Sequence, residues 1–166
     1  MTLYLGIDPG LSGGISLFNP SDWSLESIDM PTAAGRKVKK TARKQTDYNA
    51  LAAVLQLPEG VEVKAFLENV WSLPNDGAIQ AHNFGLNVGA IRGVLATYDL
   101  EPELILATTW KKHFGLIGTE KKASVEKAFE KFPNSIDVLT GPRGGAKDGR
   151  CEASLIALYA YERPQP

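Results

Sequence analysis

Four acidic residues stand where folding could gather them for chemistry on a phosphate group. Asp8 follows an apolar N-terminal run, and Glu68 ends a second apolar run in the middle of the chain. Asp148 and Glu152 are four residues apart in a helical pattern, so both lie on one helix face. A buried carboxylate is costly unless a cation compensates it. Since carboxylate oxygens suit Mg²⁺, the pattern favours a magnesium site.

The corner after Asp8 has three interpretations. Pro9 biases Asp8 toward an extended backbone, while Gly10, Gly13 and Gly14 let the chain turn back closely. The carboxylate could ligate a hard cation, or the glycine amides could surround a phosphate. Asp-Pro-Gly is also ordinary turn chemistry. The acids of the last helix have a similar alternative, because acids in a first turn commonly interact with the helix dipole.

The elements that would position these acids alternate between strands and helices, which predicts an α/β fold. Strands are expected as a pair within residues 3–18, at 23–30 on a sheet edge, at 61–68 and at 103–107. Thr46 or Asp47 would cap a short helix that stops before Pro58. Further helices are expected from 78 to 98, from Thr108 or Thr109 to 114, from 119 to 132 and from 148 to 161, with a glycine-rich connection at 135–147.

Basic residues are concentrated in one segment of an otherwise acidic chain. The net charge is -1, yet six of the 18 basic residues fall within nine positions. We expect residues 32–45 to form a flexible loop that either contacts DNA phosphates or is simply solvated. Four lysines on either side of a later glycine-containing turn also favour phosphate contact. The two groups are Arg36, Lys37, Lys39, Lys40, Arg43 and Lys44, and then Lys111, Lys112, Lys121 and Lys122.

Length and composition limit the possible classes of protein. A chain of 166 residues with 43% apolar and 22% charged residues predicts a single globular domain over 1–166. No apolar run reaches membrane-span length and no leader is evident, so we expect a soluble cytoplasmic protein with no membrane partner. Cys151 is the only cysteine, which excludes an internal disulfide, and we interpret it as a small helical residue.

Glycines recur at intervals of four in the helix expected at 78–98. Gly85, Gly89 and Gly93 each cost about 1 kcal/mol relative to alanine in a helix. Their spacing indicates that another backbone approaches this face, either from the chain's own sheet or from a second subunit.

The ordered set of motifs resembles the ribonuclease-H-like nucleases and, more closely, the RuvC family of Holliday junction resolvases, including its phage-type members. The resemblance spans nearly the whole chain. The matching residues are Leu5-Gly6-Ile7-Asp8-Pro9-Gly10, Glu68-Asn69-Val70-Trp71, Ala90-Ile91-Arg92-Gly93-Val94, Trp110-Lys111, Lys121-Lys122, and Asp148 with Glu152-Ala153.

The resemblance implies a ribonuclease-H-like α/β fold, with a five-stranded mixed sheet flanked by helices. It also implies a homodimer that uses two Mg²⁺ ions, or Mn²⁺ in their place, to cut two symmetric strands of a four-way DNA junction. Asp8, Glu68, Asp148 and Glu152 match the metal-binding acids. Trp71 matches an aromatic residue near the crossover, although a tryptophan there could equally anchor the core or a loop. This protein would act in the nucleoid or in a phage-infected cell, and the product would carry a 5′ phosphate.

The resemblance also assigns basic residues to the reaction. Lys111 and Lys122 match residues near the scissile phosphates, with Lys121 an equally reachable neighbour. The family's acidic pair on the last helix is usually two aspartates three apart, whereas this chain has Asp148 and Glu152 four apart. Both spacings share a helix face, so which of these two acids is the direct ligand stays open.

Three other functions are compatible with parts of the pattern. A phosphotransferase of the actin and hexokinase type has a similar first strand, but it needs a second half for which the chain has no room. A junction-binding protein would use the same surface without cutting. A less selective nuclease would cut other branched DNAs as well.

Overall fold

A five-stranded mixed sheet organises the computed structural model, which describes residues 1–38, 41–70 and 77–163, without the side chains of 36–43. The strand order is β3-β2-β1-β6-β7. Strands β1 to β3 pair in antiparallel fashion, and β6 and β7 run parallel to β1, so the sheet is mixed, as the resemblance implies. The bounds are Thr2–Asp8 for β1, Gly14–Asn19 for β2, Ser24–Asp29 for β3, Glu62–Glu68 for β6 and Glu103–Ile105 for β7.

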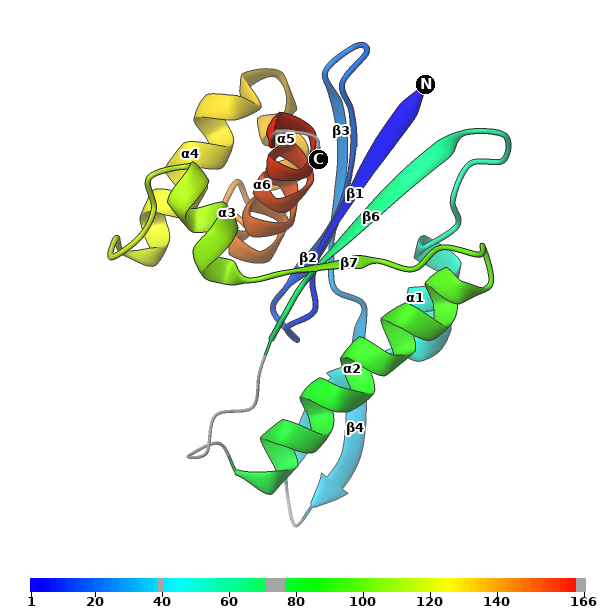
Figure 1. Cartoon of the computed structure of the whole chain (residues 1–166). Coiled ribbons are helices and arrows are strands. Elements are labelled where there is room, and N and C mark those ends of the chain that lie inside the picture. The colour runs from blue at the N-terminus through cyan, green and yellow to red at the C-terminus, as the bar shows by residue number, and fades with distance from the viewer. Residues whose placement is uncertain (39–40, 71–76, 164–166) are drawn as a thin grey trace.

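Helices cover both faces of this sheet (Figure 1). On one face α3, α4 and α6 enclose a core that includes Phe18, Trp110 and Leu155. On the other face α1 and α2 enclose a second core that includes Leu51 and Ile91. The helix bounds are Tyr48–Val54 for α1, Ala78–Ala96 for α2, Ala107–His113 for α3, Lys121–Lys131 for α4, Ile136–Leu139 for α5 and Asp148–Glu162 for α6.

Helix α6 lies directly on the central strand because glycine removes the side chain at the crossing. A Cβ atom built on Gly6 of β1 would lie 2.2 Å from the carbonyl oxygen of Ala153. At the start of α6, a Cβ on Gly149 would lie 2.2 Å from the carbonyl oxygen of Ser12. These two close approaches fix the first turn of α6 beside the chain that leaves β1.

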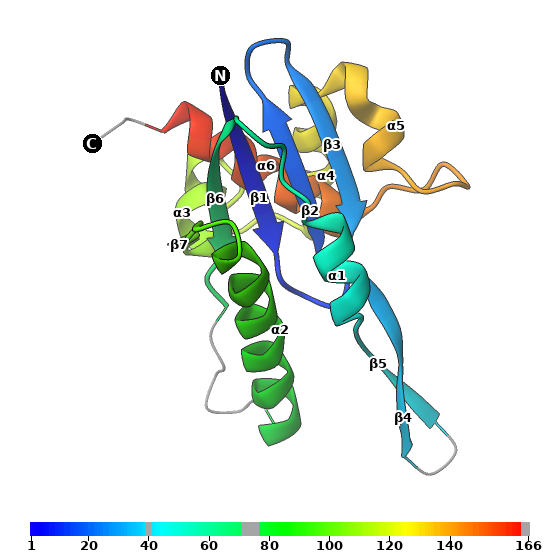
Figure 2. The ribbon, with the colours of Figure 1, turned by 90° about the vertical axis from the view of Figure 1, so that its right-hand side faces the viewer.

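The basic segment expected as a flexible loop is a β-hairpin, so that prediction was wrong. Strands β4 (Thr32–Val38) and β5 (Thr41–Thr46) pair in antiparallel fashion, with an irregularity between Ala34 and Lys37. The hairpin projects beyond the end of the main sheet (Figure 2). Its strands have no apolar alternation, so the sequence lacks the usual strand signal. Their described residues belong to neither apolar core.

Hydrogen bonds anchor the base of the hairpin to the rest of the protein. The buried hydroxyl of Thr46 donates to Asn87 Oδ1 on α2 over 2.6 Å, and the Asn87 amide donates to the Pro9 carbonyl over 3.4 Å. Asp47, rather than Thr46, caps α1 by accepting from the Ala50 amide over 3.0 Å.

Helix α2 does not use its glycines to approach the chain's own sheet. A Cβ atom on Gly85, Gly89 or Gly93 would have no heavy atom within 4 Å, whereas Ile91 and Leu95 on another side of the helix are fully buried. The first of the two expected arrangements is therefore wrong. Among the described helices, α2 included, none combines the length and apolar character needed to cross a membrane.

The remaining differences concern helix boundaries and one connection. Leu106 precedes α3 and Glu120 precedes α4, in place of the threonines expected at these positions. The connection expected at 135–147 contains α5, which follows a 3₁₀ turn at Pro133–Ser135. Cys151 is fully buried in α6, and burial raises the pKa of its thiol to about 12, in line with a structural residue.

Candidate active site

Asp8 and Glu68 lie side by side at the carboxyl ends of two neighbouring parallel strands, β1 and β6. Ile7 of β1 is in register with Leu67 of β6, so the next residue of each strand leaves the sheet at the same edge. Asp8 is partly buried and Glu68 is buried. The strand register brings these two acids together, as expected.

Glu68 is held by a hydrogen bond from a buried tryptophan. The indole nitrogen of Trp110, on α3, donates to Glu68 Oε1 over 3.0 Å. Burial and the neighbouring charge of Asp8 raise the pKa of Glu68 to about 7. The Trp110 hydrogen bond and the charge of Lys111 act in the opposite direction, and Glu152 adds to the increase.

Asp8 is held by the turn that follows it. Its Oδ1 accepts a hydrogen bond from the Gly10 amide over 3.0 Å. Burial raises the pKa of Asp8, against that hydrogen bond, and the charge of Glu152 raises it further. Lys121 and Lys111 lower it. Three acids and two lysines therefore share one electrostatic environment.

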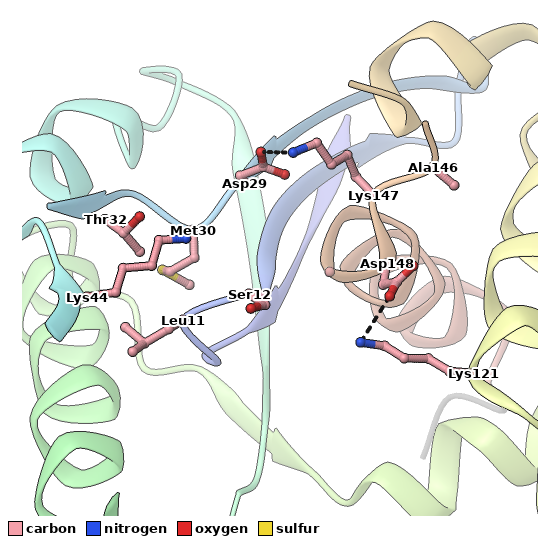
Figure 3. A pocket seen from close by; sticks show the side chains of 12 residues that line it. Leu11, Ser12, Asp29, Met30, Thr32, Lys44, Lys121, Ala146, Lys147 and Asp148 are labelled. Carbon is pink, nitrogen blue, oxygen red and sulfur yellow. Dashed lines mark ion pairs between the residues drawn. The ribbon is translucent and has the colours of Figure 1, made fainter. Parts of the chain in front are cut away.

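The two acids of α6 occupy different positions. The charge of Glu152 raises the pKa of both Asp8 and Glu68. Its Oε1 lies 3.7 Å from Lys111 Nζ. Asp148, one turn earlier, is more exposed and pairs with Lys121 Nζ over 3.0 Å (Figure 3). The structure thus places Glu152 with the two strand acids and Asp148 at the border of the site.

The lysines differ in the same way. Lys121 reaches the acids, whereas its neighbour Lys122 is 79% exposed at the side chain and pairs with Glu126 on its own helix over 3.1 Å. The structure does not place Lys122 among the acids, contrary to the expectation for it. Lys112 is exposed on α3, and Lys111 is partly buried beside Trp110.

Several predicted DNA-binding residues lie where no side-chain geometry is described. Trp71, Lys39 and Lys40 fall outside the described residues. Arg36, Lys37 and Arg43 belong to the hairpin strands, without described side chains. Lys44 is described and exposed, at the base of β5.

Two hollows flank the acids. One, of about 430 Å³, lies between α3 and α4 and is lined by Lys111, Lys121 and Glu152. The other, of about 320 Å³, lies between the hairpin and the start of α6 and is lined by Lys44, Lys121 and Lys147, among others (Figure 3). Lys121 lines both hollows, which therefore adjoin at this residue.

The donor set suits a hard divalent cation such as Mg²⁺. Asp8, Glu68 and Glu152 offer oxygen ligands, and their mutual repulsion is the kind that a bound cation relieves. No group of three His, Cys, Asp or Glu residues in the described part of the chain is already arranged around a metal position. Lys111 and Lys121 instead supply the nearest positive charges, and the ion pairs to Glu152 and Asp148 would open if these acids became ligands.

The residues that support the acids have little signal in the sequence. Trp110 was expected only as part of a motif, and no local signal shows that its indole reaches Glu68, 42 positions away in the sequence. Asn87 had no signal beyond its polarity. Gly6 has a recognisable sequence signal, since a glycine inside an apolar strand often marks a close approach of another backbone.

The sheet order and the placement of α6 define a known architecture, the ribonuclease H-like fold, as predicted. The chain is similar in structure to RuvC of Thermus thermophilus, with 15% identity, a TM-score of 0.52, and coverage of 96% of this chain and 95% of that chain. T. thermophilus RuvC in complex with a Holliday junction substrate matches with 12% identity, a TM-score of 0.55 and the same coverage. No family model and no curated protein sequence matches the chain.

Proposed function

We propose that this protein is a Mg²⁺-dependent endonuclease that resolves four-way DNA junctions by paired symmetric cuts. The observation that carries the proposal is the gathering of Asp8, Glu68 and Glu152 with Lys111 and Lys121 at one edge of a ribonuclease H-like sheet. The charge of Glu152 raises the pKa of Asp8 and of Glu68, and Asp8 also raises that of Glu68; acids coupled in this way beside lysines match phosphodiester hydrolysis. The likeness to a RuvC that was solved with a Holliday junction supports the choice of substrate.

The proposed ligands are Asp8, Glu68 and Glu152, with Asp148 completing the set from the border of the site. Two Mg²⁺ ions, or Mn²⁺ in their place, would supply activation of the attacking water and stabilisation of the leaving oxygen. The Gly10 amide orients the Asp8 carboxylate, and the Trp110 indole orients that of Glu68. Lys111 and Lys121, once released from their acids, balance charge on the phosphate.

We propose further that the exposed face of α2 joins two copies of the chain. Gly85, Gly89 and Gly93 leave room for a second backbone that the described part of the chain does not provide. Ile79 and Leu86, on the same helix, are 59% and 45% exposed. A two-fold dimer would present two equivalent acid sites, which symmetric cuts in a four-way junction require.

The decisive test uses the purified protein and a synthetic four-way junction at low salt, with Mg²⁺ or with EDTA. We expect paired nicks at symmetric positions that need Mg²⁺ and disappear in Asp8→Asn. Asp22→Asn, in an exposed turn between β2 and β3, is the matched control and should cut like the wild type. Junction binding without any Mg²⁺-dependent cut would contradict the nuclease and leave a junction-binding protein.

Substrate breadth needs its own comparison. We expect four-way junctions to be cut in preference to flaps, three-way junctions and linear duplex of the same sequence. Equal rates on all of these DNAs would contradict junction selectivity and indicate a general nuclease of branched DNA.

A further inference from the structure

The hollow between the basic hairpin and the start of α6 has the chemistry of a second phosphate site, which adjoins the acid site and shares Lys121 and Asp148 with it. Three lysines reach it from three different elements: Lys44 from β5, Lys121 from α4 and Lys147 from the residue that precedes α6. Lys44 and Lys121 approach the space from opposite sides (Figure 3). The hydroxyl-bearing residues Ser12 and Thr32 also line it.

The two acids in this hollow are already neutralised. Asp29 accepts from Arg150 Nε over 2.8 Å and pairs with Lys147 over 3.0 Å. Although burial opposes it, these two bonds lower the pKa of Asp29, which therefore stays ionised and committed to them. Asp148 is paired with Lys121. Lys44 has no ion pair with any side chain that the structure describes, so its charge is available to an anion.

The position of the hollow relates it to the acid site. Ser12 and Gly13, which line it, follow Asp8 by a few residues in the same turn. Lys44 pairs with Ala34 toward the base of the hairpin, whose strands also carry Arg36, Lys37 and Arg43. The hairpin itself extends beyond the main sheet (Figure 2). A volume of about 320 Å³ is at the lower end for ligand pockets, which fits one nucleotide unit rather than a duplex.

We infer that this hollow binds one backbone phosphate of the DNA strand being cut, next to the scissile phosphate, and that Lys44 is its principal charge. The inference rests on the proposed function for the identity of the strand. The site sets the register of the DNA and carries no base recognition, since phosphate contacts position a nucleic acid without reading its sequence. The hairpin then continues the same path along the backbone.

The test is the salt dependence of junction binding, measured in EDTA so that no cutting is needed. Each neutralised phosphate contributes about 0.7 to 0.9 to the slope of log K against log salt. We expect Lys44→Gln to lower the slope by that amount, which corresponds to about five- to eightfold weaker binding at 0.1 M salt. Lys127→Gln, on α4 and paired with Glu130, is the matched control and should keep the wild-type slope.

A second measurement locates the contact. Junctions with a single neutral methylphosphonate, placed in turn at each position around the cut, are titrated with the wild type and with Lys44→Gln. We expect one position at which the wild type loses affinity and Lys44→Gln does not, because the partner charge is already absent. An unchanged slope in Lys44→Gln, or a loss at every position alike, would overturn the phosphate site.

The outcomes separate this site from the proposed activity. A protein that cuts junctions with no effect of Lys44→Gln on binding lacks the second site and keeps its function. A protein that shows the Lys44-dependent methylphosphonate position but never cuts keeps the phosphate site and loses the nuclease assignment. Circular dichroism and thermal unfolding of Lys44→Gln verify the fold, which an exposed position should leave intact.

Discussion

The indole of Trp110 donates a hydrogen bond to Glu68 over 3.0 Å, from a fully buried position. This contact holds one carboxylate oxygen of Glu68 and leaves the other free for a cation. It also joins α3 to the end of β6, which ties the orientation of an active-site acid to the packing of the core. Support of this kind commonly decides how well an acid binds metal.

Trp110→Phe should therefore weaken Mg²⁺ binding about tenfold or more, because outer contacts of metal ligands typically have that effect. Loss of the hydrogen bond and of ring volume should also lower the free energy of unfolding by about 2 to 3 kcal/mol. Titration calorimetry and urea unfolding measure the two effects. Trp23→Phe is the control, since the Trp23 indole donates to the Lys131 carbonyl, and its Mg²⁺ affinity should stay at the wild-type value.

The pKa of Glu68 predicts a pH dependence of stability in the absence of metal. Burial and Asp8 raise this pKa to about 7 from the usual 4.5. Between these values the native state holds a proton that the unfolded chain has lost, so the free energy of unfolding should fall as pH rises from about 4.5 to about 7.

Glu68→Gln removes this titration and tests the sign. The variant should be more stable than the wild type at pH 8, by on the order of 2 kcal/mol, and the difference should vanish near pH 4.5. Urea unfolding in EDTA across this range gives the comparison. Parallel curves for the wild type and Glu68→Gln would contradict the shifted pKa, and the exposed Glu59→Gln should follow the wild type throughout.

Glycine at the crossing of β1 and α6 should be indispensable. A Cβ on Gly6 would overlap the Ala153 carbonyl at 2.2 Å and the Ala157 amide at 2.5 Å. Because backbone cannot yield there without lifting α6 from the sheet, we expect Gly6→Ala to cost about 3 kcal/mol or more. Gly145→Ala, where a Cβ would meet nothing within 4 Å, is the comparison by thermal unfolding. Similar melting temperatures for the two variants would argue against the close packing.

The sequence predicts the five strands of the main sheet and the positions of two acids because both depend on local patterns. Apolar runs that stop at Asp8 and Glu68 define buried strands and place both acids at strand ends. The hairpin has no such pattern, and those of its residues whose side chains are described belong to neither apolar core. Whether Glu152 or Asp148 lies beside the two strand acids depends on how α6 is rotated on β1. The spacing of the two residues does not reveal this rotation.

The exposed glycines of α2 lead to a prediction about assembly. Gly89→Arg places a long charged side chain on the face proposed for the dimer and should shift the protein to monomers in sedimentation equilibrium. Its monomeric fold should survive, because the position opens to solvent. Gln80→Arg lies nine residues away, which is about 180° around the helix, and should leave the dimer intact. Equal behaviour of the two variants would contradict an interface centred on these glycines.

Adjacent lysines of α4 offer the closest matched pair in the site. Lys121 pairs with Asp148 over 3.0 Å and lowers the pKa of Asp8, whereas Lys122 is largely exposed and pairs with Glu126 on its own helix. Lys121→Gln should reduce the single-turnover rate of junction cutting about 10²-fold, the typical loss when a group that stabilises transition-state charge is removed. Lys122→Gln should change this rate less than about threefold, as expected for a surface ion pair within one helix. The reverse order of effects would mean that α4 turns when DNA binds and presents Lys122 to the phosphate.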